Sequence, residues 1–291
     1  MLPSELFQAV RHLEIVARRA VNDHLAGQYH SVFKGRGMDF QDVRAYQPGD
    51  DIRVIDWNVS ARMNELHVKQ FVEERELTVF LLVDASASQS FGTRHRRKQE
   101  TAAQLSALIA FSAIKNNDRV GLILFTDQVE VFIPPRKGRK HVLRVIKEVL
   151  QPGVEKRGTC LSTPLEYLAR ISKRRSVAFL ISDFLDQDFE KALKITQRRH
   201  EVIPLVIVDP MESSIPKMGI VHFEDPETGE VVAVDTSSKA VREAFRAHMA
   251  RVRRDQERTF RKLEMDSVHV DTGEDHIEPL VRYFRRRAAR L

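Results

Sequence analysis

The chain has 291 residues, of which 42% are hydrophobic, so it can bury one large domain, or a large and a small domain, around an apolar core. Its 47 lysines and arginines against 41 aspartates and glutamates leave a net charge of only +6. This balance of interspersed charges favours a salt-bridged surface over a nucleic-acid footprint. The basic clusters at residues 94–98 and 285–287 are not interleaved with aromatics and indicate solvated faces.

The cysteine content and the apolar runs restrict the compartment. Cys160 is the only cysteine, which excludes a disulfide within the chain and zinc sites built on Cys-x-x-Cys pairs. The N-terminal segment carries Glu5, Arg11, Glu14 and Arg18 among its apolar residues, which breaks the core of a signal peptide. No apolar run reaches the roughly 18–20 residues needed to span a bilayer. We therefore expect a cytoplasmic protein without a membrane span.

Short apolar runs alternate with amphipathic segments from Leu77 onward, a pattern typical of a parallel sheet covered by helices on both faces. Strands are expected at residues 77–83, 119–125, 129–135, 176–183, 201–209 and 267–270. Helices are expected at residues 99–115, 142–149, 163–171, 189–199, 238–265 and 277–287. Pro134 and Pro135 close the strand at 129–135 and confine it to an edge, in a hairpin with 119–125. The sequence thus predicts an α/β fold, a doubly wound and mostly parallel sheet with one antiparallel edge strand.

Local signals add detail to this pattern. Thr163, Pro164 and Glu166 predict a capping-box start for the helix that follows them. Residues 220–236 predict a second hairpin, with its turn at 226–229. Asp209 closes a strand and precedes a proline, so a turn role is sufficient for it.

Residues 1–75 have a different pattern. An N-terminal helix through Leu13, Val16 and Ala17 precedes a stretch that is dense in Gly, Asp, Arg and aromatics and lacks helical periodicity. We therefore expect an N-terminal helix plus a small irregular or β-rich module at residues 1–75, and the α/β domain at residues 76–291.

Two features of this module have structural explanations. Trp57, the only tryptophan, is expected to pack the module against the sheet domain. Paired carboxylates could perform acid-base chemistry, but neighbouring arginines favour a structural ion-pair network. The residues concerned are Asp50, Asp51, Asp56, Arg44 and Arg53.

Oxygen-bearing side chains gather at predicted strand ends. Asp84, Ser86 and Ser88 occupy alternate positions directly after the strand at 77–83, a spacing that can direct all three to one point. Thr159 and Asp183 fall at equivalent strand or loop ends, where ligands bind in doubly wound sheets. One carboxylate with two hydroxyls suits Mg²⁺ or Mn²⁺ and is poorly suited to zinc. The alternative for the first three residues is a polar strand end with a serine capping the next helix.

The stretch "DASAS" with Thr159 and Asp183 resembles the metal-ion-dependent adhesion site of von Willebrand factor A-like domains, whose motif is Asp-x-Ser-x-Ser with a distant Thr and Asp. The resemblance implies that the five side chains hold a divalent cation and leave one coordination position for an acidic side chain of a partner. The family usually has glycine where this chain has Phe184 and Arg157. We expect the Arg157 cation to compete for the carboxylates.

The stretch before the "DASAS" strand is similar to the bacterial domain-of-unknown-function family fifty-eight, and the match runs over nearly the whole chain. The residues that carry it are Gly35, Asp39, Phe40, Arg44, Tyr46, Gly49, Asp50, Arg53, Asp56, Trp57, Ala61, Arg62, Val68, Lys69 and Glu74. Members are typically encoded beside MoxR-type AAA+ ATPases. The resemblance therefore implies an ATP-hydrolysing partner, with a chaperone-like role in assembly or maturation.

The leading functional hypothesis is a non-enzymatic interaction module, in which a cation held by the five residues captures an acidic group of a partner. A Mg²⁺-dependent phosphatase or other hydrolase is the alternative, although haloacid dehalogenase-like phosphatases need an aspartate where Ser86 stands. The chain has no phosphate-binding loop of the Gly-x-x-x-x-Gly-Lys type and no Gly-x-Ser-x-Gly elbow. Nucleic-acid binding through the basic clusters is a second alternative.

Overall fold

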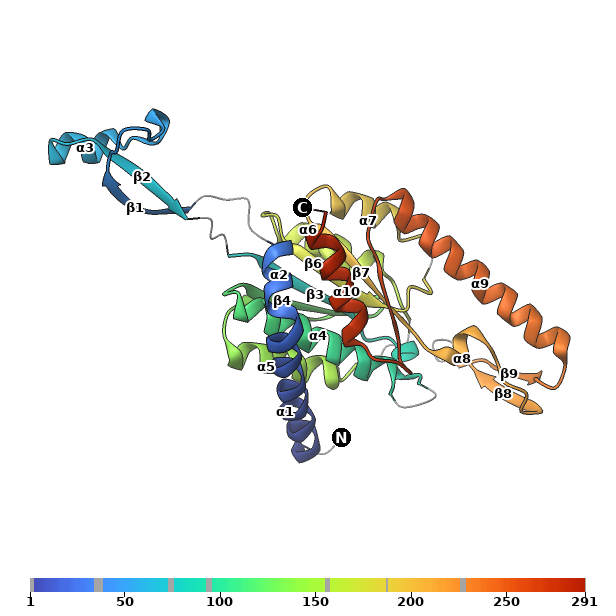
Figure 1. Cartoon of the computed structure of the whole chain (residues 1–291). Coiled ribbons are helices and arrows are strands. Elements are labelled where there is room, and N and C mark those ends of the chain that lie inside the picture. The colour runs from blue at the N-terminus through green and yellow to red at the C-terminus, as the bar shows by residue number, and fades with distance from the viewer. Residues whose placement is uncertain are drawn as a thin grey trace.

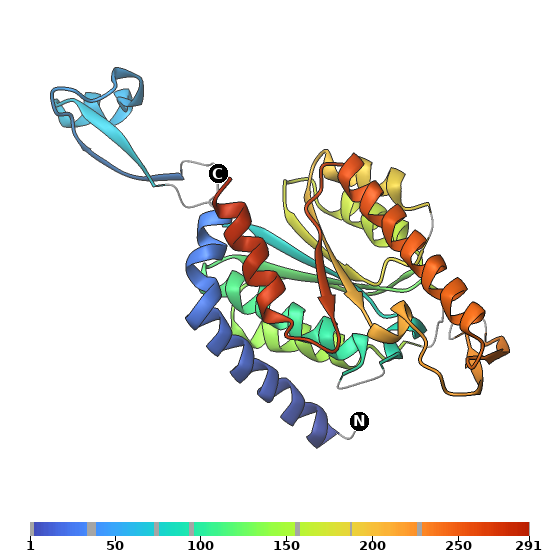
Figure 2. The same ribbon diagram turned by 45° about the vertical axis from the view of Figure 1, so that its right-hand side comes forward.

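A computed structural model describes residues 3–33, 39–72, 76–92, 96–154, 158–186, 188–225 and 229–290. Its main part is a layered α/β body, and a small module projects from this body in both views (Figures 1 and 2). Within the described residues, no helix is both long and apolar enough to cross a membrane.

A six-stranded sheet with strand order β10-β7-β6-β3-β4-β5 forms the centre of the body. Its strands are β3 (Thr78–Asp84), β4 (Arg119–Phe125), β5 (Val129–Arg136), β6 (Val177–Ser182), β7 (Glu201–Val208) and β10 (Val268–Asp271). All neighbouring pairs are parallel except β4 and β5. The mostly parallel sheet with one antiparallel edge strand is therefore confirmed.

Both faces of this sheet are buried, because successive strand side chains point to opposite sides. Val79, Leu81 and Val83 of β3 belong to one apolar core, and Phe80 and Leu82 belong to the other. The first core is covered by α1 (Pro3–Ala20), the π-helical turn η1 (Val21–Leu25), α2 (Ala26–Val32), α4 (Lys98–Lys115), α5 (Arg139–Leu150) and α10 (Ile277–Ala288). The second is covered by α6 (Ser162–Ile171), α7 (Glu190–Gln197) and α9 (Lys239–Lys262) (Figure 2).

The N-terminal helices pack on the sheet domain. Tyr29 of α2 is buried, and its hydroxyl donates to Asp118 Oδ2 over 3.1 Å. Asp118 Oδ1 accepts from the Leu77 N–H over 2.8 Å, directly before β3. This contact ties α2 to the start of the central strand. The sequence groups residues 1–75 as one unit, whereas the packing places α1 and α2 with the sheet and leaves the described residues 39–72 apart.

The projecting module contains two strands and one short helix. β1 (Asp39–Ala45) and β2 (His67–Val72) form an antiparallel pair, and between them lie a 3₁₀ turn, η2 (Ile52–Val54), and the helix α3 (Trp57–Met63). Arg44 and Asp50 form a two-pronged ion pair with N–O distances of 2.7 and 2.6 Å. Asp51 and Asp56 instead cap η2 and α3 by accepting from backbone N–H groups. The structural role of these carboxylates is confirmed, although only Arg44 and Asp50 pair as expected.

The prediction for Trp57 is wrong. Its side chain is 64% exposed and does not pack against the sheet domain. Trp57 is the first residue of α3, which lies in the projecting module (Figure 1). The capping of α3 by Asp56 sets the start of this short helix, and the ring consequently faces solvent.

The remaining elements agree with the sequence pattern except at one helix start. β8 (Ile220–Glu224) and β9 (Val231–Asp235) form the second hairpin, and residues 226–228 of its expected turn lie outside the described residues. The capping box expected at Thr163 is wrong, because α6 already begins at Ser162 and has no side-chain cap. The Thr163 hydroxyl instead donates to the Asp127 carbonyl over 3.2 Å.

The buried Asp118 carboxyl predicts a pH effect on stability. Burial raises its pKa to about 6, against the hydrogen bonds from Leu77 and Tyr29. The folded pKa lies above the unfolded value, so the protonated carboxyl contributes stability that is present below about pH 4 and lost as the pH rises through 6. Asp118→Asn should remove this loss, which we expect to reach about 3 kcal/mol at most.

Urea unfolding at several values between pH 4 and 8 measures this effect. The exposed Asp255→Asn in α9 is the control, and its unfolding free energy should run parallel to that of the wild type. Parallel curves for Asp118→Asn as well would contradict the assignment.

Candidate metal centre

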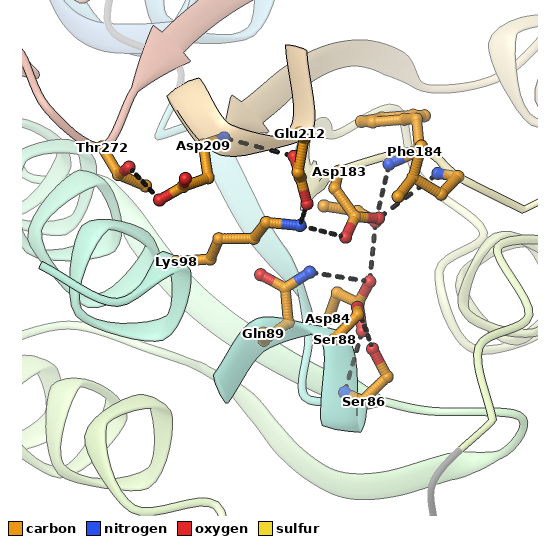
Figure 3. A network of polar contacts seen from close by, with 12 residues as sticks. Asp84, Ser86, Ser88, Gln89, Lys98, Asp183, Phe184, Asp209, Glu212 and Thr272 are labelled. Atoms are coloured by element: carbon orange, nitrogen blue, oxygen red, sulfur yellow. Dashed lines mark hydrogen bonds and ion pairs between the residues drawn. The ribbon is translucent and has the colours of Figure 1, made fainter. Parts of the chain in front are cut away.

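Asp84 is the last residue of β3 and lies at the carboxyl edge of the sheet, with only 2% of its surface exposed. Its Oδ1 accepts from the Ser86 N–H over 2.9 Å. Its Oδ2 accepts from the Ser182 hydroxyl over 2.7 Å and from Gln89 Nε2 over 3.3 Å (Figure 3). Donors from β6 and from the loop after β3 therefore fix both carboxyl oxygens.

Ser86 and Ser88 lie beside this carboxyl, Ser86 directly before the turn η3 (Ala87–Ser90) and Ser88 within it. Their hydroxyl oxygens are 3.0 Å apart (Figure 3). Ser86 precedes η3, but its side chain makes no capping bond to it, and α4 follows Arg97, which is no side-chain cap either. The capping alternative is thus not what the structure shows. The two hydroxyls are neighbours at the edge where Asp84 lies.

Asp183 follows β6, the strand beside β3, and is brought close to Asp84 by the parallel register of Val83 with Ile181. Burial raises the pKa of Asp84, and the negative charge of Asp183 raises it further, to about 7. Hydrogen bonds from Ser182 and Ser86 oppose this rise. The strand ends therefore hold two carboxyls in a buried place where positive charge is favourable.

Thr159 lies in the segment before α6. Its segment is held by the Cys160 N–H, which donates to the Thr126 carbonyl over 3.0 Å just beyond β4. The Ala85 N–H donates to the Phe125 carbonyl over 2.8 Å, which joins the loop after β3 to the same strand end. Thr159 therefore lies at the same edge, one strand away from Asp84. Arg157 lies outside the described residues.

Contacts or charge thus link four of the five predicted residues. Asp84 and Ser86 share a hydrogen bond, Ser86 and Ser88 are in hydroxyl contact, and Asp183 acts on Asp84 through its charge. Thr159 is brought to this edge by its strand position alone.

Lys98, the first residue of α4, is a component of the site that the sequence analysis missed. It is 1% exposed, and its Nζ lies 2.8 Å from Asp183 Oδ2 and in contact with Glu212 Oε1 (Figure 3). The prediction of a solvated face for the basic cluster at residues 94–98 is therefore wrong for Lys98. Its position at the start of the helix that follows "DASASQS" and packs on the sheet was the available signal.

The charges of Lys98, Asp183 and Glu212 stabilise one another. Burial by itself lowers the pKa of Lys98, but the carboxylates of Asp183 and Glu212 outweigh burial and keep the pKa above its ordinary value. For Glu212, burial is the largest effect and raises the pKa, while the Lys98 charge opposes the rise. Lys98 is therefore an ammonium ion at neutral pH.

Glu212 is held by a second polar group, at the ends of β7 and β10. Asp209, fully buried, caps the short helix α8 (Pro210–Ser213) by accepting from the Met211 N–H, and Glu212 Oε2 accepts from the Asp209 N–H over 3.2 Å. The Thr272 hydroxyl donates to Asp209 Oδ2 over 2.8 Å (Figure 3). The turn role expected for Asp209 is confirmed, and Asp209 connects the ends of β7 and β10 to the site through Glu212.

Phe184 stands where the adhesion-site pattern usually has glycine, and its backbone explains that preference. Its φ of 55° lies in the left-handed region that glycine adopts most easily. The ring is buried against Phe189 and Phe260, with centroid distances of 5.7 and 5.3 Å. The Phe184 carbonyl also accepts from Gln256 Nε2 of α9 over 2.6 Å. Packing thus holds a phenylalanine in a conformation that costs about 1–2 kcal/mol.

The donors fit a hard divalent cation by their chemistry. Across the described part of the chain, no three His, Cys, Asp or Glu side chains are grouped as ligands for a metal ion. The predicted set has only two carboxylates, so its three hydroxyls have to contribute oxygen ligands, which suit Mg²⁺ or Mn²⁺. Burial and the charge of Asp183 are the two largest causes of the raised pKa of Asp84, so added positive charge beside this acidic pair would be favourable.

Comparison with known proteins decides the family. The family described as "Protein of unknown function DUF58" matches residues 42–255, which is most of the chain. The chain belongs to this family. The match confirms the resemblance that the N-terminal motif indicates, and it covers most of the projecting module together with five of the six strands of the central sheet.

Two relatives of this DUF58 protein match different shares of its length. The uncharacterized protein Rv1480 of Mycobacterium tuberculosis (strain ATCC 25618 / H37Rv) is 34% identical over 291 residues, covering 98% of this chain and 91% of that protein. The uncharacterized protein YeaD of Bacillus subtilis (strain 168) is 27% identical over 161 residues, covering 55% of this chain and 38% of that protein.

Two solved structures are distantly similar. One is BatB from Bacteroides thetaiotaomicron, with a TM-score of 0.48 and 16% identity over 73% of this chain and 99% of that chain. The other is an aerotolerance-related membrane protein from Bacteroides fragilis NCTC 9343, with a TM-score of 0.47 and 18% identity over 74% of this chain and 100% of that chain. At this low similarity, neither structure indicates a function for the DUF58 protein.

The bond between Thr272 and Asp209 can be tested directly. Thr272→Val removes the donor to a buried carboxylate oxygen, so we expect the free energy of unfolding to fall by about 1–3 kcal/mol. Urea unfolding followed by circular dichroism measures the change. Thr259→Val in α9 is the matched control for exchanging a hydroxyl for a methyl group, and equal losses at the two positions would argue against the assigned bond.

Proposed function

We propose that this DUF58 protein is a non-enzymatic protein-interaction module with a von Willebrand factor A-like sheet domain. In this proposal Asp84, Ser86, Ser88, Thr159 and Asp183 hold Mg²⁺ or Mn²⁺, and the site captures an acidic group of a partner. The single observation that carries the proposal is the buried Asp84 carboxyl facing Asp183 at the ends of neighbouring parallel strands.

The place of the pair in the sheet supports this proposal. β4 lies on one side of β3 and β6 on the other, so the chain leaves the central strand in both directions. Ligands of open α/β sheets bind beyond the carboxyl ends of strands at such a point. Asp84 and Asp183 flank it, and Asp84 is fixed by Ser182, so the charged groups are positioned before any ligand arrives.

The proposed ligands differ in charge. The two carboxylates supply negative charge, and the hydroxyls of Ser86 and Ser88 supply neutral oxygen ligands. When bound, a divalent cation supplies an electrophilic position that a carboxylate of a partner can occupy. Such a charge-assisted contact is strong when it is partly shielded from water.

The proposed partner is a MoxR-type AAA+ ATPase, or a client protein of such an ATPase that presents an acidic side chain. Membership of the DUF58 family supports this choice, because the resemblance implies that ATPase neighbourhood. Work with an ATPase would give the module a chaperone-like role in assembly or maturation.

The alternatives are less well supported by the described residues. A phosphatase of the haloacid dehalogenase-like type needs a second aspartate at position 86, where the Ser86 hydroxyl contacts Ser88 instead. In the basic C-terminal helix, Arg286 pairs with Asp266, and Arg287 pairs with Glu201. Charges that are satisfied within the chain are less available to phosphate groups.

Cation binding should appear as thermal stabilisation. We expect Mg²⁺ or Mn²⁺ at millimolar concentration to raise the Tm of the wild type relative to chelator, because a ligand that binds only the folded state stabilises it. Asp84→Asn should lose this cation-dependent rise and unfold in chelator no earlier than the wild type, because the neutral amide relieves the repulsion from Asp183. Differential scanning fluorimetry measures both quantities.

The exposed Asp255→Asn is the matched control and should keep the full cation-dependent rise. A rise of the same size in Asp84→Asn would remove Asp84 from the site.

Partner capture tests the second half of the proposal. With Mg²⁺ kept constant, so that an ATPase can still bind its nucleotide, the wild type should retain a purified MoxR-type AAA+ ATPase or its client at least about tenfold more strongly than Asp84→Asn or Ser88→Ala. Surface plasmon resonance gives the two dissociation constants. Equal constants for the wild type and both variants would remove the metal site from partner recognition.

A further inference from the structure

The buried ammonium of Lys98 lies between Asp183, a proposed cation ligand, and Glu212, which the cation proposal does not use. Lys98 is 1% exposed, and both carboxylates are within ion-pair range of its Nζ. A lysine buried to this degree is rare unless it is paired, so its two partners are the condition for its place in the core. Figure 3 shows its side chain crossing from α4 toward the ends of β6 and β7.

We propose that Lys98 is a built-in counter-cation that weakens cation binding at the Asp84–Asp183 site and sets its preference for divalent ions. This inference rests on the proposed function, because it concerns the affinity of the same site. Lys98 is a positioning residue: it holds Asp183 through Oδ2 and is itself no proposed ligand.

The charges give the reason. With their carboxylates ionised, Asp84, Asp183 and Glu212 carry three negative charges and Lys98 carries one positive charge. The cluster therefore has a net charge of minus two, which a divalent cation balances. Without the ammonium the net charge is minus three, which attracts any cation more strongly and favours a trivalent one. A nearby like charge acts on a bound ion in proportion to the ion's own charge.

Glu212 gives the ammonium of Lys98 a second partner that is not a proposed cation ligand. Glu212 is fixed by the Asp209 N–H, and Asp209 is fixed by Thr272, so the ion pair is anchored at the ends of β7 and β10. Lys98 thus stays beside Asp183 whether or not the site is occupied. The Lys98 charge therefore lowers the affinity of the site for cations even before a cation binds.

The experiment compares the full chain with Lys98→Met, Lys98→Arg and Glu212→Gln. Calorimetric titration with Mn²⁺ and luminescence titration with Tb³⁺, at one fixed pH, give the dissociation constants. We expect Lys98→Met to bind Mn²⁺ about tenfold more tightly and Tb³⁺ more tightly still, with the logarithms of the two gains in a ratio near 3 to 2. Lys98→Arg should resemble the wild type, and Glu212→Gln should weaken both ions.

The double variant Lys98→Met/Glu212→Gln serves where the single Lys98 change prevents folding. It removes the charges of Lys98 and Glu212 together, so the net charge of the cluster stays at minus two and Asp183 alone loses a charged partner. Its Mn²⁺ affinity should lie within about threefold of the wild type. A gain as large as that expected for Lys98→Met would contradict the charge argument.

The outcomes separate this inference from the proposed function. Unchanged or weaker Mn²⁺ binding in folded Lys98→Met, or equal gains for Mn²⁺ and Tb³⁺, overturns the role of Lys98 while the metal site stands. Absence of Mn²⁺ and Tb³⁺ binding in the wild type and in every variant overturns the metal site itself, and the role of Lys98 falls with it.

Discussion

The buried carboxyl of Asp84 is the constraint on which the rest of the site depends. A carboxylate at the end of a core strand loses its hydration, and this loss has to be offset by donors or positive charge. Ser182, Ser86 and Gln89 supply the donors, and Lys98 reaches the neighbouring Asp183. Asp84 accepts from β6 and from the segment after β3, and Asp183 accepts from Lys98 of α4, so satisfying these two carboxyls brings together segments that are far apart in the chain.

The same requirement explains how the layers of the sheet domain support the site. The apolar cores on both faces hold β3 and β6 in register, and this register places Asp84 beside Ser182. Gln256 of α9 binds the backbone of Phe184 and so holds the loop after Asp183. The helices therefore support the site by packing on the strands. Apolar contacts in the two cores position the side chains that donate to Asp84.

Much of the fold follows from local pattern. The continuous apolar run of β3 and the prolines in β5 predict a central strand and an edge strand, because burial on both faces and a missing N–H act on each strand separately. Asp84, Ser86, Ser88 and Asp183 could be proposed as neighbours because parallel strands end at one edge. Trp57 and the start of α6 were predicted wrongly, since each depends on how a short segment packs and not on its own periodicity.

The sequence by itself determined the strands, the helices, the family and the oxygen-bearing residues of the candidate site, because these depend on residue type and spacing along the chain. Tertiary structure alone decided that Lys98 is buried between Asp183 and Glu212, that α1 and α2 pack with the sheet, and that Phe184 adopts a left-handed backbone. The physical reason is that the free energy of a buried charge depends on which groups folding brings beside it. The basic cluster at residues 94–98 does not indicate that Asp183 and Glu212 lie beside Lys98.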